Sequence, residues 1–222
     1  YGLNEIDWPD PLKEMQRNWI GRSEGASVLF QVEEGSRKSE VGSSQPETDQ
    51  PFHIEIFTTR PDTIFGATFM VLAPEHELVD KLTTKRQKEA IESYLDYVKS
   101  RSDVERQQEK KVTGEFTGSY VVNPFTKQRI PVWIAEYVLA GYGTGAIMAV
   151  PSDDERDFLF AQMFRLPVID VIDRSDYPGK TRADKVGKML NSGFINGMEV
   201  KDAIKTVIDK LEESGIGRCR VN

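Results

Sequence analysis

Cysteine and histidine are scarce in this sequence. Its 222 residues include one cysteine, Cys219, and two histidines, His53 and His76. A single cysteine excludes an internal disulfide framework and fits a reducing compartment, so we expect a cytoplasmic location. The HExxH and CxxC patterns of metal sites are absent, and the glutamates beside His76 do not share its face of a helix. We therefore expect no metal site, and a solvated helix start around His76.

Long apolar segments are also missing. The longest uncharged run, residues 137–150, has 14 residues and contains three glycines, whereas a membrane-spanning helix needs roughly 20 apolar residues. No basic segment followed by an apolar one opens the sequence, so we expect neither a signal peptide nor a membrane partner. The first residue is Tyr1 instead of methionine, and we interpret the chain as an excised domain of a larger protein.

Positive charge is in deficit as well. The chain has 36 acidic and 29 basic side chains, which give a net charge of -7. Contacts to phosphates need clustered lysine and arginine, so this balance argues against a protein that holds nucleic acid on its own. If the substrate is an RNA, another part of a larger protein must bind most of it.

What is present fits one globular domain, because 38% hydrophobic and 29% charged residues are ordinary for a chain that buries a core. We predict an α/β fold with a mixed sheet, in which hairpin-like turns argue against a doubly wound sheet. Strands are predicted at 26–32, around 53–56, and at 129–135, 146–150 and 168–172. Helices are predicted at 11–20, from Pro74, and at 84–101, 153–164 and 200–213. Turn signals lie at Thr113-Gly114, Thr117-Gly118, Asn123-Pro124 and 193–197, and polar loops at 33–51 and 173–188.

Polar side chains follow the strand that begins at His53. This strand leads to Thr58, Thr59 and Arg60, and Pro61 then starts a turn. Two hydroxyls and a guanidinium at the end of a strand are candidates for contact with a polar substrate.

A second polar group follows the strand at 146–150, which stops at Pro151. The pattern Ser152-x-x-Glu155 resembles a capping box and predicts a helix start. Asp154 and Asp157 lie three residues apart there, so they face the same way. The glycines at 141, 143 and 145 precede a strand, which favours an inter-strand turn over a dinucleotide-binding loop, since that loop needs a helix after its glycines.

Both stretches resemble motifs of one family. The run TTRPDT, residues 58–63, resembles the threonine-rich motif of the editing domain of leucyl-tRNA synthetases, and GYGTGAIMAVPSDDERD, residues 141–157, resembles its second signature. The flanks, WP at 8–9, MQRNWIGRS at 15–23 and the tail CRVN, resemble the junctions with the catalytic core. The resemblance implies a barrel-like mixed sheet with surrounding helices, as in class I synthetases. It divides the chain into a hinge at 1–24, an editing domain at 25–214 with a mobile loop at about 33–51, and a return to the core at 215–222.

The same resemblance implies an activity, the hydrolysis of the ester bond between tRNA(Leu) and a wrong amino acid such as norvaline or isoleucine. The partners it implies are the acylated 3′ end of tRNA(Leu) and the catalytic core of a parent synthetase in the same chain. The domain itself would need no cofactor, while ATP and magnesium would serve the parent's core, which ligates leucine to tRNA. We expect the isolated domain to be monomeric.

Catalytic roles are implied for Thr58, Thr59 and Asp157, and substrate binding for Asp154 beside them. Asp157 matches the position that binds the substrate's α-ammonium, and Asp154 would share that charge or position water. Thr58 and Thr59 match positions that contact the amino acid or the attacking water. The acids could instead only complement a helix dipole, and the threonines could only fill a strand end.

Substrate binding is implied for five residues in addition to Asp154. Arg60 matches an arginine that anchors the terminal nucleotide, although a surface ion pair is the alternative. Thr63 matches the residue that fills the space where the branch of leucine would go. Tyr142, Met148 and Val150 match contacts to the terminal adenosine or the amino acid, and core packing is the alternative for the last two.

One position departs from the family pattern. Bacterial relatives usually have histidine where this chain has Asp153, and three aspartates therefore fall within 153–157. Two other functions remain open at this point. The chain could be an editing domain of an isoleucyl or valyl enzyme, or a module that binds amino acid or adenosine without turnover.

Overall fold

A computed structural model describes residues 24–33, 52–102, 105, 111–141, 143–182 and 184–221. The predicted helix at 11–20, the predicted loop at about 33–51 and the hinge at 1–24 lie outside these residues, apart from Glu24 and Glu33. Tyr142 also lies outside them. Of the helices within the described ranges, none is long and apolar enough to cross a membrane.

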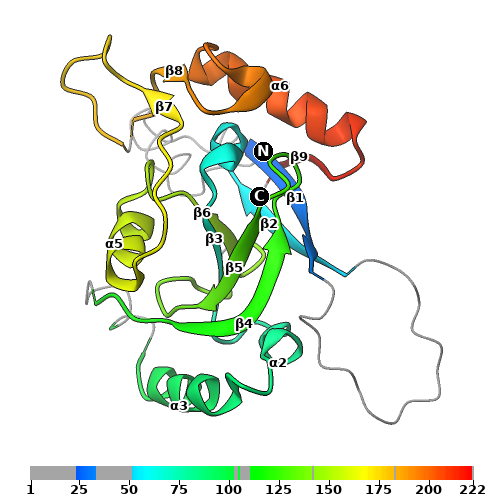
Figure 1. Ribbon diagram of the computed structural model, residues 1–222, viewed down its shortest axis with the longest axis vertical. Helices are drawn as coiled ribbons and strands as arrows, with labels where there is room; N and C mark the ends of the chain where they lie inside the picture. Colours follow the sequence, from blue (N-terminus) through cyan, green and yellow to red (C-terminus); the bar gives the residue numbers. More distant parts are fainter. Residues whose placement is uncertain are drawn as a thin grey trace, which may run out of the picture.

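The centre of the fold is a mixed sheet, in agreement with the predicted fold class (Figure 1). The strand order is β2-β1-β4-β5-β3-β6. Strand β4 pairs with the end of β1, at Gln31 and Val32, and β9 pairs with its first residues, 24–28. The pair β3–β5 is parallel and the others are antiparallel. The end strands β2 and β6 approach each other, which curls the sheet towards a barrel. The strands are β1 Glu24–Val32, β2 His53–Thr58, β3 Phe69–Leu72, β4 Glu115–Val122, β5 Arg129–Ile134, β6 Ala146–Ala149 and β9 Gly217–Val221.

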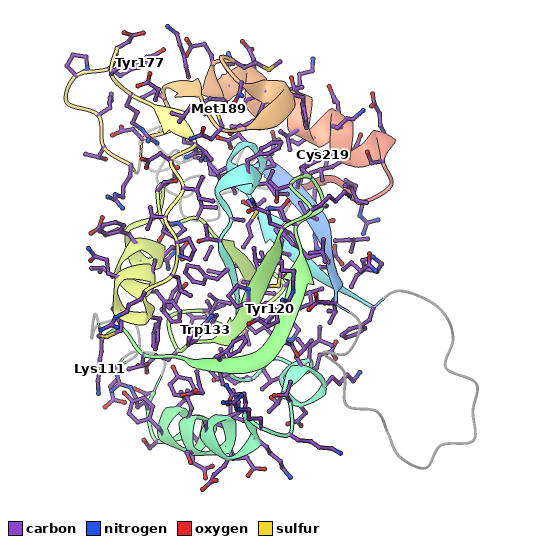
Figure 2. The ribbon with its side chains drawn as sticks, viewed as in Figure 1. Lys111, Tyr120, Trp133, Tyr177, Met189 and Cys219 are labelled. Carbon is purple, nitrogen blue, oxygen red and sulfur yellow. The ribbon has the colours of Figure 1, made fainter. Side chains whose placement is uncertain are left out.

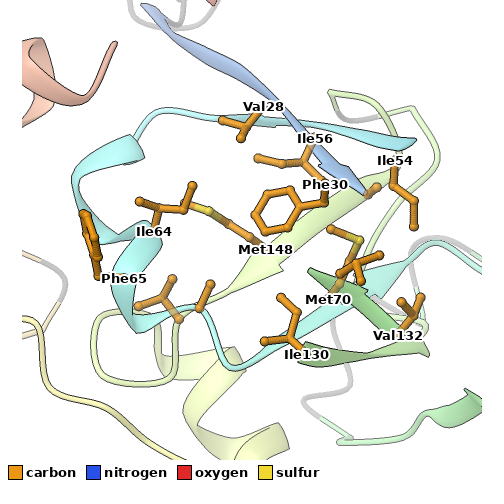
Figure 3. Close-up of a cluster of buried hydrophobic side chains, with 14 of the residues drawn as sticks. Val28, Phe30, Ile54, Ile56, Ile64, Phe65, Met70, Ile130, Val132 and Met148 are labelled. Carbon is orange, nitrogen blue, oxygen red and sulfur yellow. The ribbon is translucent and has the colours of Figure 1, made fainter. Parts of the chain in front are cut away.

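Side chains from alternate positions of the strands build two apolar clusters, because successive residues of a strand point to opposite faces. In β3, Met70 and Leu72 belong to the cluster inside the curled sheet, which Figure 3 shows around Phe30 and Met148. Phe69 and Val71 point to the other face and pack in a second cluster with Phe160 of helix α5 (Glu155–Phe164). β3 is thus buried on both faces.

Helices cover the sheet from three sides (Figure 1). Helix α5 packs on the outer face beside Trp133, which Figure 2 labels. There Trp133 contacts Phe160 and Phe164. The short helix α2 (Val79–Leu82) and α3 (Lys88–Lys99) lie beside β4. Helix α6 (Val200–Glu213) lies against β9 and against the 3₁₀ helix η2 (Pro61–Gly66). Two small elements lie near α6. They are the hairpin of β7 (Ile172–Asp173) and β8 (Lys188–Met189), and the 3₁₀ helix η3 (Gly193–Ile195).

One predicted strand and one predicted turn need correction. The predicted strand at 168–172 is regular only as β7, and Val168 is 43% exposed. This segment meets no long partner strand, since only Ile172 and Asp173 pair with β8. Thr117-Gly118 is not a turn but an irregular place within β4, where the register shifts between Phe116 and Tyr120 and Gly118 has a φ of +88°.

The helix predicted at 84–101 begins only at Lys88, and two other predicted helix starts are also wrong. Residues 74–78 form turns, in which half-buried His76 accepts the Leu78 N–H on Nδ1 at 3.1 Å, so the helix begins only at Val79. A side chain that binds the nearby backbone competes with helix formation. The second helix begins at Glu155 instead of 153. Its N-cap is Asp154, which has extended backbone angles, while Ser152 donates to Asp153.

Candidate active site

A cavity of about 180 Å³ lies where β2, η2, β6 and the start of α5 meet. This volume is below the range of roughly 300–1,000 Å³ that is usual for pockets of drug-sized ligands. It suits a small group such as one amino acid. The lining residues are Phe57, Thr58, Thr59, Arg60, Thr63, Ile147, Met148, Val150, Asp153, Asp154, Arg156 and Asp157.

Hydrogen bonds to the backbone fix two of the threonines. Thr58 Oγ1 accepts the N–H of Arg60 at 2.9 Å. Thr63 Oγ1 donates to the carbonyl oxygen of Arg60 at 2.9 Å, and only 2% of Thr63 is exposed. A β-branched side chain has few rotamers, and a hydroxyl tied to the backbone leaves fewer still. Thr63 therefore forms a rigid wall of the cavity.

Arg60 forms an ion pair with Asp62 through Nε and Nη2, at distances of 2.8 to 3.2 Å. The side chain of Asp62 is fully buried, so this is not the surface ion pair that the sequence suggested as an alternative. Burial raises the pKa of Asp62, and the Arg60 guanidinium partly offsets this effect. This ion pair spans the turn into η2 and holds the Arg60 side chain beside the cavity.

Asp157 lines the cavity and is buried, with 4% of its surface exposed. Its Oδ1 accepts the hydroxyl of Tyr137 at 2.9 Å, and its Oδ2 accepts the N–H of Val150 at 2.8 Å. Burial raises the pKa of Asp157 to about 7, and the charge of Asp154 adds to this shift. Each carboxylate oxygen has more than one lone pair, so a buried cation in the cavity could still bind here and favour the ionised form.

Asp154 caps the first turn of α5. Its Oδ1 accepts the N–H of Arg156 at 2.8 Å and the N–H of Asp157 at 3.2 Å. Its Oδ2 lies 3.5 Å from the guanidinium of Arg156, and 41% of its side chain is exposed. Asp154 therefore does what the helix-dipole alternative describes, since it caps the start of α5. It also lines the cavity.

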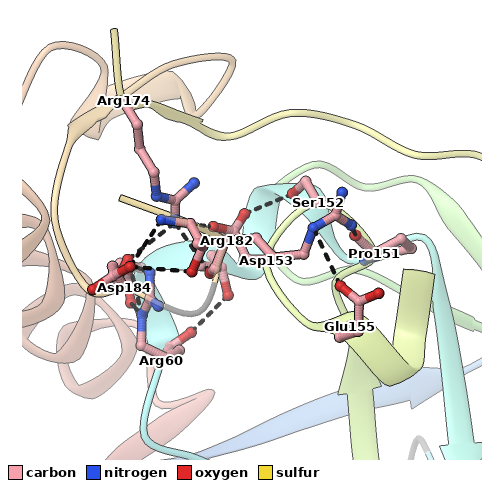
Figure 4. Close-up of polar contacts among 11 residues, drawn as sticks. Arg60, Pro151, Ser152, Asp153, Glu155, Arg174, Arg182 and Asp184 are labelled. Atoms are coloured by element: carbon pink, nitrogen blue, oxygen red, sulfur yellow. Dashed lines mark hydrogen bonds and ion pairs between the residues drawn. The ribbon is translucent and has the colours of Figure 1, made fainter. Parts of the chain in front are cut away.

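Asp153 is paired, although it adds a third aspartate to this region. Arg174 Nη2 donates to Asp153 Oδ1 at 2.6 Å, Ser152 donates to Oδ2, and 4% of the Asp153 side chain is exposed (Figure 4). Arg174 also donates to the carbonyl oxygens of Arg182 and Asp184. The arginine thus neutralises the added charge and fastens the loop after β7 to the turn beside the cavity.

The loop after β7 is fastened a second time through Arg182. Its Nη1 donates to the carbonyl oxygen of Pro151 at 2.9 Å (Figure 4). Its guanidinium lies 3.9 Å from the ring centre of Phe158. The loop contacts therefore converge on the turn that joins β6 to α5. This turn carries Asp154 and leads to Asp157.

The structure brings together eight of the nine residues predicted for the site, and Tyr142 is outside the described ranges. Their roles in binding and catalysis stay predictions. Met148 and Val150 line the cavity and also belong to the inner apolar cluster, so both interpretations of these two residues hold structurally.

Sequence reasoning did not assign Phe57, Ile147 and Arg156 to the site. Phe57 and Ile147 flank predicted residues on their strands, and Arg156 lies between the two predicted acids, so adjacency was the available signal. Tyr137 carried no signal, because only the tertiary fold brings its hydroxyl to Asp157.

The glycine turn before β6 agrees with the prediction, since Gly143 and Gly145 have φ values of +64° and +71° and a strand follows. A Cβ on Gly145 would lie 3.2 Å from the ring of His76.

Among the described residues, no group of three or more His, Cys, Asp and Glu side chains is arranged to hold a metal ion.

Comparison with known proteins gives consistent matches. A family described as "Leucyl-tRNA synthetase, editing domain" matches residues 17–212. A leucine–tRNA ligase of Cytophaga hutchinsonii is 48% identical over 224 residues, which cover 100% of this chain and 23% of the ligase. A crystal structure of the ternary complex of Agrobacterium radiobacter K84 agnB2 LeuRS, tRNA and LeuAMS matches with a TM-score of 0.73 and 32% identity, again over 100% of this chain and 23% of that one. The chain spans about a quarter of the length of these relatives.

Proposed function

The chain belongs to the family of leucyl-tRNA synthetase editing domains, and from this premise we propose that it hydrolyses the ester bond between tRNA(Leu) and a wrong amino acid, such as norvaline or isoleucine. The observation that carries the proposal is that Thr63 and Asp157 line one small cavity. A carboxylate can bind the α-ammonium there, and a fixed side chain can limit the size of the amino acid. The match to the leucyl family speaks against an editing domain of the isoleucyl or valyl enzymes.

The amino end of the substrate would bind to Asp157. An ammonium inside a buried cavity needs an ionised partner, and a charge-assisted hydrogen bond to a carboxylate provides one. The Asp157 carboxylate is already held by Tyr137 and Val150, so it loses little freedom when the ammonium binds. The bound ammonium would in turn lower the pKa of Asp157 from its raised value.

The ester end would lie near Thr58 and Thr59. An ester between an amino acid and a ribose is already activated, so the protein has to orient a water molecule and stabilise the oxyanion. Thr58 Oγ1 uses one lone pair to accept the Arg60 N–H, and its own proton remains available for the water or the oxyanion. The water oxygen bonds to the acyl carbon, the ester C–O bond breaks, and the ribose oxygen leaves with a proton.

The side-chain end would meet Thr63. One methylene is worth only about 1–3 kcal/mol in a binding pocket, so a synthetic site alone rejects smaller amino acids poorly. A second site that admits what is smaller or straighter than leucine completes the selection. The rigid Thr63 wall would leave room for norvaline and clash with the branch of leucine.

Other functions of the parent are part of the same proposal. The chain would be one part of a cytoplasmic leucyl-tRNA synthetase, whose core would ligate leucine to tRNA(Leu) with ATP and magnesium and would hold the tRNA body. The editing reaction itself would proceed without a cofactor. We propose that the isolated domain is a monomer.

The test is deacylation of norvalyl-tRNA(Leu) by a full-length synthetase that carries this chain, with and without the substitution Asp157→Ala. We expect Asp157→Ala to abolish clearance. Asp157→Asn should do the same, although its amide oxygen can still accept the Val150 N–H and its NH2 group can donate to the Tyr137 oxygen. Asp209→Ala, which removes an exposed carboxylate from α6, serves as the matched control and should act like the parent. Retained hydrolysis by both Asp157 variants would remove Asp157 from the site.

A further inference from the structure

Tyr137 connects the outer apolar cluster to the cavity. It lies three residues after the end of β5 and packs against Phe160 of α5, with ring centres 5.8 Å apart. The guanidinium of Arg156 lies 5.8 Å from the centre of its ring. Only the hydroxyl reaches the site, where it donates to Oδ1 of Asp157 at 2.9 Å.

The two protein donors to Asp157 come from different parts of the fold. Tyr137 follows β5, and Val150 follows β6, whereas Asp157 itself lies on α5. Each donor binds one carboxylate oxygen, so together they set the plane of the carboxylate. If the Tyr137 hydroxyl were absent, one oxygen would lack its protein donor and the carboxylate could rotate.

We propose that Tyr137 is a positioning residue for the editing reaction, whose hydroxyl orients the Asp157 carboxylate that receives the substrate's ammonium. The inference rests on the proposed function for the role of Asp157. Tyr137 does not line the cavity, and it acts through Asp157 instead of touching the substrate.

The charges around Asp157 explain why a tyrosine suits this place. Asp154 disfavours the ionised form of Asp157, while Arg156, the Val150 N–H and the Tyr137 hydroxyl favour it. Of the other charged residues that line the cavity, Arg60 pairs with Asp62 and Asp153 pairs with Arg174. Burial and the neighbouring Asp157 raise the pKa of Tyr137 well above 10. The phenol therefore stays a proton donor over the whole range in which Asp157 titrates.

Tyr137→Phe tests the proposal, because phenylalanine keeps the ring and its packing on Phe160. Loss of one hydrogen bond to the ionised form should raise the pKa of Asp157 by about one unit. We expect a carbon-13 NMR titration of the Asp157 carboxyl to show this shift. The acid limb of the deacylation rate, after subtraction of spontaneous hydrolysis, should move to higher pH by the same amount.

Tyr177→Phe is the matched control. Tyr177 lies in the loop between β7 and β8 (Figure 2), and its hydroxyl also donates to a carboxylate, that of Glu199, at 2.7 Å. It does not line the cavity, so this variant should leave the Asp157 titration and the pH profile unchanged.

Two results would overturn the role of Tyr137. One is an Asp157 titration in Tyr137→Phe that matches the parent. The other is a rate that falls equally at all pH values together with a lower Tm, which would show that the tyrosine only packs. Failure of the proposed function would be visible separately, since Asp157→Ala would then still deacylate norvalyl-tRNA(Leu) whatever the titration shows.

Discussion

At the scale of single residues, we propose that Thr63 decides which amino acids the cavity admits. Its hydroxyl is used by the carbonyl oxygen of Arg60, and its side chain is almost fully buried. The exclusion of leucine would therefore depend on the shape of Thr63 more than on its polarity.

This leads to a prediction with two variants. Thr63→Ala should open the cavity, and hydrolysis of correctly charged Leu-tRNA(Leu) should rise by roughly ten- to a hundredfold, the worth of about one methylene group. Thr63→Val keeps the shape and loses only the hydrogen bond, so it should still spare Leu-tRNA(Leu). Deacylation assays with both variants in the full-length synthetase measure this. If Thr63→Ala also spares Leu-tRNA(Leu), Thr63 is not the wall.

Asp157 predicts a dependence of stability on pH. Its pKa is about 7 in the folded chain and 3.8 in an ordinary environment. Between these values the unfolded chain releases the proton while the folded chain keeps it, so the free energy of unfolding falls as pH rises towards 7. Asp157→Asn removes this loss. We expect its stability gain to be roughly 2 kcal/mol larger at pH 8 than at pH 5, measured by urea unfolding at both pH values.

Asp173→Asn provides a control of opposite sign. A backbone hydrogen bond from Ser175 lowers the pKa of exposed Asp173, so its ionised form stabilises the fold above the ordinary pKa and this contribution is lost as pH falls. This variant should gain nothing at pH 8. Equal gains for Asp157→Asn at pH 5 and pH 8 would mean that Asp157 does not titrate as burial implies.

At the scale of elements, the position of η2 depends on Asn123. Asn123 is fully buried and donates through Nδ2 to the carbonyl oxygen of Ile64 in η2 at 2.8 Å. Its Oδ1 accepts the N–H groups of Phe125 and Thr126. One side chain thus joins the β4–β5 turn to the element that carries Thr63.

Asn123→Ala should therefore lower the free energy of unfolding by roughly 2–3 kcal/mol, because it leaves the buried carbonyl oxygen of Ile64 and two half-buried backbone N–H groups without this partner. With η2 less fixed, hydrolysis of Leu-tRNA(Leu) should also rise. Asn196→Ala is the control, since Asn196 accepts the N–H of Ser192 beside the other 3₁₀ helix, η3. This control should lose less stability, measured by thermal unfolding, and keep its selectivity. Unchanged selectivity in Asn123→Ala would separate η2 from substrate selection.

The elements also show what sequence patterns can predict. Helix α6 was predicted with its observed bounds, because Ala203, Val207 and Leu211 repeat with the helical period and lie buried. Strand β9 was missed, since its residues are mostly exposed and only its backbone pairing with β1 makes it a strand. The sequence pattern predicts Ser152 as the N-cap of α5, whereas the N-cap is Asp154. A capping-box spacing does not tell which of several neighbouring residues has the extended backbone angles of an N-cap.

In the site, too, some features can be predicted from the sequence and others cannot. Residues close together in the two motifs could be assigned from sequence, and they do line one cavity. The pairing of Asp153 with Arg174, 21 residues later, and of Tyr137 with Asp157 depends on tertiary contacts that no local pattern contains.

At the scale of the whole molecule, the net charge of -7 implies that the proposed hydrolysis and the affinity for tRNA reside in different parts of a synthetase. An acidic domain gains little from phosphate contacts, so other parts of a synthetase would hold the tRNA body. We expect kcat/KM for norvalyl-tRNA(Leu) to be at least about tenfold lower for the isolated chain than for the full-length enzyme. A small norvaline–adenosine amide should bind both equally, as titration calorimetry can show. Equal kcat/KM values would mean that this domain itself supplies the affinity for tRNA.

The most direct measurement is a crystal structure of the chain with an amide-linked norvaline–adenosine analogue. The analogue's ammonium should lie within hydrogen-bond distance of the Asp157 carboxylate, and its side chain should contact Thr63. An analogue bound elsewhere, or bound in this cavity with its ammonium away from Asp157, would contradict the proposed editing site.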